Sequence, residues 1–212
     1  MKPIILITGV SSGIGEALCL SLRDIYTIIG ISRKKPQDTD NYTWLQVDVT
    51  DMDEHAELYQ YLQDNNIQLD GVIHNAGIGY FGELSSIDWM KRHAMLETNL
   101  IAPLEITQDL LDQKLLQEKA KIIFIGSHAA KKSLKHGAVY QATKFAIRGY
   151  AMGLKNELTQ KVHIINPSIV DTNFHNESDI DMSVHKQTKM EDIVFSAGNI
   201  LLGEDQRFEI DL

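Results

Sequence analysis

The chain has 212 residues, of which 43% are hydrophobic and 23% charged, and this composition fits one globular domain over 1–212 with a sizeable core. A formal net charge of -9 argues against a nucleic-acid groove or an anionic membrane surface, and favours a small-molecule substrate. The single cysteine, Cys19, excludes an intrachain disulfide and a thiolate metal cluster. We therefore predict a soluble, cytoplasmic protein that holds no metal.

Short β-branched runs alternate with longer amphipathic stretches along the chain. We expect strands at 4–8, 26–32, 43–47, 71–75, 121–127, 162–166 and 207–210. We expect helices at about 14–24, 52–65, 88–116, 138–159 and 190–202. The first apolar run passes directly into a glycine loop, so we read it as a buried strand rather than a signal peptide. The alternation predicts an α/β fold, a doubly wound and mostly parallel sheet of seven strands with helices on both faces.

A glycine-rich loop with the spacing GxxxGxG joins the first expected strand to the first expected helix. Glycines at such a turn admit positive φ angles and let a pyrophosphate approach, while the helix N-terminus offers free N–H groups and a partial positive charge. A turn that binds no ligand is the alternative. The residues predicted to bind the dinucleotide here are Gly9, Ser11, Ser12, Gly13, Ile14 and Gly15.

The end of the second expected strand indicates which cofactor binds. An NAD site places an acidic residue there to accept hydrogen bonds from the ribose hydroxyls. This chain instead has Ser32 followed by Arg33, whose guanidinium suits a 2′-phosphate. The sequence therefore predicts that NADP(H) is favoured over NAD(H). Alternatively, Arg33 belongs to a solvated basic loop with Lys34 and Lys35.

Two further strand ends contribute to the predicted cofactor site. Asp48, beside Val49, either holds the adenine amino group or caps the helix expected from residue 52. Asn75, Ala76 and Gly77 follow the fourth strand at the carboxyl edge, where ligands of open α/β sheets bind. Small side chains at this edge leave room for a ribose.

A tyrosine and a lysine, Tyr140 and Lys144, are four positions apart and share one face of a helix. A free phenol has a pKa of about 10, and a positive charge about 4 Å away contributes roughly 4 kcal/mol before desolvation opposes it. We therefore expect Lys144 to lower the pKa of Tyr140. Ser127 ends a separate strand and is expected to share the same substrate oxygen.

Taken in order, these motifs give the sequence a resemblance to the short-chain dehydrogenase/reductase family over nearly its whole length. The matching elements are TGVSSGIG from Thr8, VDV at 47–49, NAG from Asn75, Asn99, Ser127, YQATK from Tyr140 and NPSIVDT ending at Thr172. The resemblance implies a single-domain Rossmann fold, a nicotinamide cofactor and interconversion of a carbonyl and an alcohol without a metal. It also implies a homodimer or homotetramer.

The resemblance assigns roles to a catalytic tetrad of Asn99, Ser127, Tyr140 and Lys144. Tyr140 acts as the general acid or base on the substrate oxygen, which Ser127 orients and stabilises. Lys144 also binds the nicotinamide ribose. Asn99 holds a water that relays protons to bulk solvent.

Two positions depart from the family's usual pattern. His74 stands where the family has an asparagine, and we expect a strand-end side chain with a satisfied hydrogen bond rather than a catalyst. Ser168 replaces the usual glycine after Pro167, in a loop whose Val170 backbone and Thr172 are implied to contact the nicotinamide carboxamide. Cofactor affinity is the property that Ser168 puts in doubt.

The substrate is expected under the short segment 172–189, with further walls at 79–81 and 129–134. The side chains that the segment offers are Phe174, His175 and Met182, which are apolar in part, and the carboxylates Asp179 and Asp181. Its shortness favours a small carbonyl compound, or one bound in an open site, over a bulky steroid.

A small-residue stripe on the helix expected at 138–159 predicts close packing against the sheet or a partner subunit. Its members are Ala142, Ala146, Gly149 and Gly153.

Two other functions compete with the oxidoreductase. A catalytically idle NADP(H)-sensing protein would keep the cofactor site without turnover, but the chain retains all four tetrad residues. An isomerase or epimerase of the wider family would carry a larger C-terminal substrate region.

Overall fold

The computed structural model describes residues 2–172, 174 and 187–212. The strands are β1 Ile4–Thr8, β2 Thr27–Ser32, β3 Thr43–Gln46, β4 Leu69–His74, β5 Leu116–Ile125, β6 Lys161–Asn166 and β7 Glu209–Asp211. The α-helices are α1 Gly13–Leu22, α2 Met52–Asp64, α3 Trp89–Leu96, α4 Ala102–Asp112, α5 Ala138–Glu157 and α6 Met190–Leu202. The described ranges also contain a π-helical turn η1 at Glu97–Ile101 and a 3₁₀ turn η2 at His128–Ala130.

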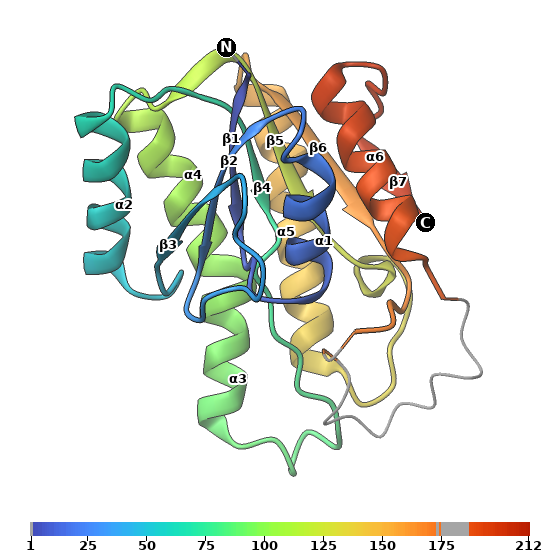
Figure 1. The fold of residues 1–212 in the computed structure, drawn as a ribbon. Helices are drawn as coiled ribbons and strands as arrows, with labels where there is room; N and C mark the ends of the chain where they lie inside the picture. Colours follow the sequence, from blue (N-terminus) through green and yellow to red (C-terminus); the bar gives the residue numbers. More distant parts are fainter. Residues whose placement is uncertain (1, 173, 175–186) are drawn as a thin grey trace.

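The strands form one seven-stranded sheet in the order β3-β2-β1-β4-β5-β6-β7, and all six neighbouring pairs are parallel. The predicted doubly wound α/β fold is thereby confirmed (Figure 1). From β1 the chain moves outward to β2 and β3, then returns across β1 to β4. The strand order thus reverses between β1 and β4, and the carboxyl end of that reversal is where open α/β sheets bind their ligands.

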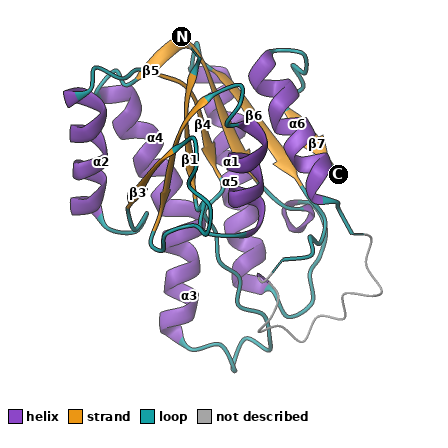
Figure 2. Cartoon of the chain, viewed as in Figure 1, coloured by secondary structure: helices purple, strands orange, loops and turns teal. Residues whose placement is uncertain are grey.

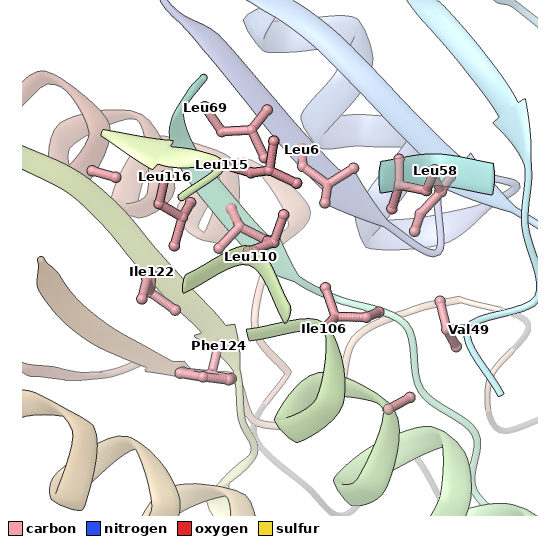
Figure 3. Packing of buried hydrophobic residues seen from close by; sticks show 14 of the residues in the cluster. Leu6, Val49, Leu58, Leu69, Ile106, Leu110, Leu115, Leu116, Ile122 and Phe124 are labelled. Carbon is pink, nitrogen blue, oxygen red and sulfur yellow. The ribbon is translucent and has the colours of Figure 1, made fainter. Parts of the chain in front are cut away.

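Alternate side chains of the central strands point to opposite faces of the sheet, and each face is covered by helices (Figure 2). Leu6 packs with residues of α2, α4 and α5, such as Leu58 and Ile106 (Figure 3). Ile5 and Ile7, on either side of Leu6, pack with residues of α1 and α6 instead. Burial on both faces explains why the strands read as nearly continuous apolar runs.

The helix expected at 88–116 is continuous from Trp89 to Asp112, and the π-helical turn η1 is inserted between its parts α3 and α4. Pro103 stands in the first turn of α4 and has no N–H group to donate to the carbonyl of Asn99, four residues earlier. A proline ring also crowds that carbonyl, so the backbone widens into a π-helical turn at this point. In Figure 1, α3 extends past the carboxyl edge of the sheet.

The start of β5 also differs from the expectation. The strand begins at Leu116 rather than at residue 121, and its pairing with β4 shifts register between the Leu69–Leu116 and Gly71–Lys121 pairs. Because residues 117–119 before buried Ala120 are polar and exposed, this irregular half of the strand shows no apolar pattern in the sequence.

The small-residue stripe of α5 does not pack against the sheet. Ala142 and Gly149 are exposed, and a Cβ added to Gly149 would meet none of the described atoms within 4 Å. The expectation that the stripe faces the sheet is wrong, because Thr143, Ile147 and Ala151 occupy the buried face. Contact with a partner subunit stays a prediction.

Candidate active site

The glycine loop lies at the carboxyl end of β1, where the strand order reverses. Gly9 has a φ of 73°, and a Cβ there would approach the Cα of Ala76 to 2.7 Å. A Cβ on Gly15 would lie 2.2 Å from the carbonyl oxygen of Gly9. Asn75 fixes the loop, since its Nδ2 donates to the carbonyl oxygens of Thr8 at 2.9 Å and of Gly9 at 3.0 Å. The loop therefore needs glycine for close backbone packing as well as for φ.

Helix α1 begins directly after this loop and its N-terminus lines the cleft. Ser12 is the N-cap residue, and its side chain makes no capping hydrogen bond. Gly13 has a φ of 61°, and among the described residues a Cβ there would contact only the Thr172 side chain, at 3.4 Å. First-turn N–H groups and the positive end of the helix dipole are thus available to an anion.

A cleft of about 970 Å³ runs along the carboxyl edge of the sheet. Of the predicted site residues, all except Gly15 and Asn99 line it. Lining residues that the sequence analysis did not assign are Lys34, Val47, Ile78, Thr98, Ile125, Gly126, His128 and Ile169. All but Ile125 adjoin a predicted residue in the chain, and Ile125 lies two residues before Ser127, so continuing each motif by one or two residues would have found them.

At one end of the cleft lie the residues predicted to recognise the adenosine part of the cofactor. Arg33 is 69% exposed, and its Nη1 is 4.0 Å from Oδ2 of Asp48. Ser32 is buried, and its Oγ accepts a hydrogen bond from Trp44 Nε1 at 3.0 Å and donates to the carbonyl of Lys34 at 2.8 Å. Ser32 therefore shapes the turn, and Arg33 presents an exposed guanidinium to the cleft, with Lys34 beside it in the lining.

The alternative in which Asp48 caps α2 is wrong. Asp51 is the N-cap, and its carboxylate accepts from the N–H groups of Asp53 and Glu54. Asp48 instead accepts from the N–H and hydroxyl of Thr50, at 3.0 and 2.8 Å. Asp48 and Val49 both line the cleft, and their predicted contact with adenine stays a prediction.

The other end of the cleft brings together Ser127, Tyr140 and Lys144. Ser127 lies two residues after the end of β5, and its Oγ accepts from the N–H of Ala129 at 3.1 Å. Tyr140 and Lys144 lie one turn apart on α5 and are both buried. The Nζ of Lys144 donates to the carbonyl of Ile125 at 3.1 Å and lies 5.7 Å from the centre of the Tyr140 ring.

Burial has the largest effect on the pKa of Tyr140 and on that of Lys144. It raises the pKa of Tyr140 to about 12, against a smaller lowering by a hydrogen bond with Ser127. Burial also lowers the pKa of Lys144 to about 8. The sequence analysis expected Lys144 to lower the pKa of Tyr140. That direction is wrong for the structure, because desolvation of the phenolate outweighs an ammonium that is bonded to the Ile125 carbonyl.

Asn99 lies behind the cleft wall rather than in it. Its Oδ1 accepts from the N–H of Ile78 at 2.8 Å, and its Nδ2 donates to the carbonyl of Ile78 at 2.8 Å and to Thr143 Oγ1 at 3.2 Å. The side chain therefore ties the loop after β4 to η1 and α5. The water-holding role implied by resemblance stays a prediction.

The two departures from the family's pattern have structural counterparts. His74 is buried, its Nε2 is 2.9 Å from Thr107 Oγ1, and its ring stacks on Phe124 with a centroid distance of 4.9 Å. Burial lowers the pKa of His74 to about 3, so the ring is neutral, which confirms the predicted satisfied side chain. Ser168 lines the cleft, and its N–H donates to Thr188 Oγ1 at 2.9 Å.

The loop after β6 contributes Pro167, Val170 and Thr172 to the cleft, as predicted, and Phe174 also lines it. The predicted substrate walls at 79–81, 129 and 132–134 are part of the same lining. The predictions made for His175, Asp179, Asp181 and Met182 lie outside the described residues.

Within the described ranges, no group of three or more His, Cys, Asp or Glu side chains is arranged to hold a metal ion. In the same ranges, no helix combines the length and apolarity that crossing a membrane requires.

The sequence is similar to a known protein family and to known proteins. A family profile, short chain dehydrogenase, matches residues 3–183. The chain is 29% identical over 167 residues to a sepiapterin reductase of Chlorobaculum tepidum, which covers 70% of this chain and 68% of that protein. It is 29% identical over 185 residues to a 3-ketodihydrosphingosine reductase of Bacteroides thetaiotaomicron, which covers 85% of this chain and 69% of that protein.

Solved structures share the fold at lower identity. A short chain dehydrogenase family protein from Francisella tularensis aligns with a TM-score of 0.87 and 21% identity, over 100% of this chain and 97% of that one. An alcohol dehydrogenase from Thermococcus sibiricus, complexed with 5-hydroxy-NADP, aligns with a TM-score of 0.83 and 23% identity, over 100% and 96%. A 3-ketoacyl-(acyl-carrier-protein) reductase from Brucella melitensis, complexed with NADH, aligns with a TM-score of 0.84 and 18% identity, over 99% and 96%.

Proposed function

The chain belongs to the short-chain dehydrogenase family, and we propose that it is an NADP(H)-dependent oxidoreductase that interconverts a carbonyl and an alcohol on a small molecule. One observation carries this proposal. Ser127, Tyr140 and Lys144 converge at one end of a cleft whose other end is formed by the glycine loop and Arg33. A hydride donor and a proton donor can therefore reach the same carbonyl group.

The residues of the cleft fit a dinucleotide. Gly13 has a positive φ and leaves open space beside the N-terminus of α1, and Ser12 does not cap that N-terminus with its side chain. A pyrophosphate would supply the missing acceptor for these N–H groups. Gly77, Lys144 and Thr172 would border the ribose and nicotinamide, as the family resemblance implies.

The preference for NADP(H) rests on Arg33. Its exposed guanidinium lines the cleft, and no acidic residue stands at the end of β2 to bind the ribose hydroxyls. The solved relatives include one complexed with an NADP derivative and one with NADH, so the residue itself must be tested.

An Arg33→Asp variant tests the cofactor preference. A charge-assisted hydrogen bond to phosphate contributes about 1.5–3 kcal/mol, so kcat/KM for NADPH should fall by about ten- to a hundredfold while that for NADH changes less. Lys35→Asp is the matched control, because Lys35 is exposed and lies outside the cleft lining. An unchanged NADPH to NADH ratio in Arg33→Asp would remove the proposed 2′-phosphate contact.

The chemistry divides between cofactor and protein. When bound, the nicotinamide supplies or accepts the hydride. Tyr140 keeps its proton at neutral pH, because its pKa is raised to about 12, and a protonated phenol is what a carbonyl oxygen needs as general acid during reduction. Ser127 would share that oxygen, and Lys144, with a pKa of about 8, would carry a positive charge beside it.

Asn99 would take part through the backbone it holds. Its side chain is engaged by Ile78 and Thr143, and Pro103 denies its carbonyl an α-helical partner. Because the Asn99 carbonyl oxygen lacks that partner, it would be able to accept a hydrogen bond from the water of the proposed relay.

A Tyr140→Phe variant tests the whole assignment. NADPH oxidation should be followed against a panel of aldehydes, ketones, quinones and sugars. Losing the general acid should lower kcat by at least about a hundredfold, while NADPH binding, measured by calorimetry, stays close to wild type. If the wild type binds NADPH but shows no Tyr140-dependent turnover, the protein is a cofactor sensor rather than an oxidoreductase.

Assembly and location follow the same reasoning. We propose a homodimer or homotetramer that buries the exposed small-residue stripe of α5, and a cytoplasmic location, which fits a single, buried cysteine. Sedimentation of the full chain tests the proposed oligomeric state.

A further inference from the structure

A third cluster of apolar residues surrounds the reactive phenol, apart from the two cores that flank the sheet. Phe81, Met95, Ala129 and Tyr140 are its buried members, and partly buried residues pack against them. Most of the cluster also lines the cleft: Ile78, Tyr80, Phe81, Ala129, Leu134, Tyr140 and Phe174. Among the described residues, an apolar wall thus lies beside the phenol, next to the polar lining residues Ser127, His128, Lys132 and Ser133, whereas the other end is lined by hydroxyl, guanidinium and carboxylate groups.

Three aromatic rings meet in this cluster. The ring centre of Phe81 lies 5.1 Å from that of Tyr140 and 6.4 Å from that of Phe174, and the Tyr140 and Phe174 centres are 5.8 Å apart. All three pairs are edge-to-face. Gly79 permits the arrangement, since a Cβ there would lie 2.7 Å from an atom of each phenylalanine ring. A flat ring carried by the substrate would find both ring faces and ring edges beside the phenol.

Leu134 separates the cleft from a second cavity. It lines both the cleft and a neighbouring cavity of about 300 Å³, whose other walls include Leu84, Ile87 and Val139. The side chain is held against Gly137, where a Cβ would come within 2.5 Å of Leu134 Cδ2. The N–H of Leu134 donates to Gln141 Oε1 at 3.3 Å, which links this wall to the helix of Tyr140.

The described residues at this end give a weaker basis for recognising a charged substrate than for recognising an apolar one. Lys132 lines the cleft but is exposed, and its neighbour Lys131 is bound to Asp211 and Glu209. A charged substituent placed against Phe81, Phe174 and Leu134 would lose hydration without gaining a partner from those three side chains.

We propose that Phe81, Phe174 and Leu134 select a carbonyl compound whose non-reacting part is a single flat, uncharged, unsaturated ring. Phe81 and Phe174 recognise the flat ring, and Leu134 limits its length. The inference rests on the proposed oxidoreductase function and names the substrate class of that site.

The test compares benzaldehyde with cyclohexanecarbaldehyde, which have the same carbon skeleton but differ in flatness. NADPH-dependent kcat/KM is measured for both in the full chain and in Phe81→Leu and Phe174→Leu. Because an aromatic pair contributes about 0.5–1.5 kcal/mol beyond its buried area, each variant should lower the benzaldehyde to cyclohexanecarbaldehyde ratio by about two- to tenfold. Phe195→Leu on α6, a residue that is 70% exposed, is the matched control and should leave the ratio unchanged.

Leu134→Ala tests the length limit. The substitution should join the cleft to the neighbouring cavity and raise kcat/KM for 4-butylbenzaldehyde relative to benzaldehyde. Circular dichroism melts establish that each variant is folded, and Phe174→Leu, whose side chain is less buried than Phe81, is the variant that carries the test if Phe81→Leu unfolds.

Three results would overturn the inference. Equal ratios in wild type, Phe81→Leu and Phe174→Leu would show that the rings do not select flat substrates. A preference for 4-carboxybenzaldehyde that Lys132→Met abolishes would show recognition of an anion instead. Absence of NADPH oxidation with every compound would remove the proposed function, and this inference with it, whereas turnover with unaltered ratios would remove the inference alone.

Discussion

A glutamate in the last strand is held by a dense set of cationic and amide donors, which makes Glu209→Gln an informative perturbation. Its carboxylate accepts from Arg148 Nε at 2.7 Å and Nη2 at 2.9 Å, and from Asn166 Nδ2 at 2.7 Å. Lys131 Nζ lies 3.0 Å away. The side chain is only 16% exposed. The Arg148 guanidinium and these further donors lower the pKa of Glu209 from its usual 4.5 to about 2.

The size of the effect follows from linkage between protonation and folding. A carboxyl whose pKa drops from 4.5 to about 2 on folding stabilises the folded state by about 3 kcal/mol at neutral pH. This contribution is complete above the unfolded pKa and is lost as pH falls from about 4.5 through about 2. Glu209→Gln should therefore cost about 2–3 kcal/mol at pH 7, or about 4–12 °C in Tm for a chain of this length, and progressively less below pH 4.5.

Urea unfolding at pH 7 and pH 3 measures both parts of this prediction. Glu118→Gln is the matched control, since Glu118 is exposed on β5, and it should change the free energy of unfolding by less than about 0.5 kcal/mol at either pH. A Glu209→Gln cost that is the same at both pH values would refute the reasoning, because it would show that lost packing rather than lost charge is responsible.

Three further outcomes follow from the site. Since burial lowers the pKa of Lys144 to about 8, kcat/KM for carbonyl reduction should fall as pH rises through about 8, and the residual activity of Lys144→Met should lack that break in its pH profile. Asn99→Ala leaves the Ile78 N–H and carbonyl without their side-chain partners and should lower the free energy of unfolding, measured in urea, by about 2 kcal/mol. A change near zero would mean that these two hydrogen bonds do not stabilise the fold. Gly9→Ala combines a φ of 73° with a Cβ placed 2.7 Å from Ala76 Cα, so it should weaken NADPH binding at least tenfold by calorimetry, and wild-type affinity would contradict the close-packing argument.

The features that the sequence predicted best are those encoded locally. Strand periodicity predicted the sheet. The glycine spacing before α1 and the interval between Tyr140 and Lys144 each fix a local geometry, and the structure places both motifs at the same edge of the sheet. His74 was also interpreted correctly, since it makes the hydrogen bond expected of a strand-end side chain. Pro103 carried a usable signal for the π-helical turn η1, since proline at that position cannot donate the α-helical hydrogen bond.

The features that were missed depend on distant partners. The pKa of Tyr140 was predicted from one neighbour in the sequence, but burial dominates it, and the Phe81 and Phe174 rings that pack against the phenol come from two other segments. The irregular start of β5 depends on its register with β4. Neither property is visible in the residue types of the element concerned.

The contacts that hold the reacting groups in place also come from residues that are far apart in the sequence. Ser127 follows β5, whereas Tyr140 and Lys144 lie on α5, so their relative position depends on contacts between those two elements. Lys131, in the turn after Ser127, and Arg148, one turn beyond Lys144, both bind Glu209 of β7. A carboxylate near the end of the chain therefore connects the two elements that carry the proposed chemistry. A motif search finds the reacting side chains, and the ion pairs of β7 explain how the fold keeps them in position.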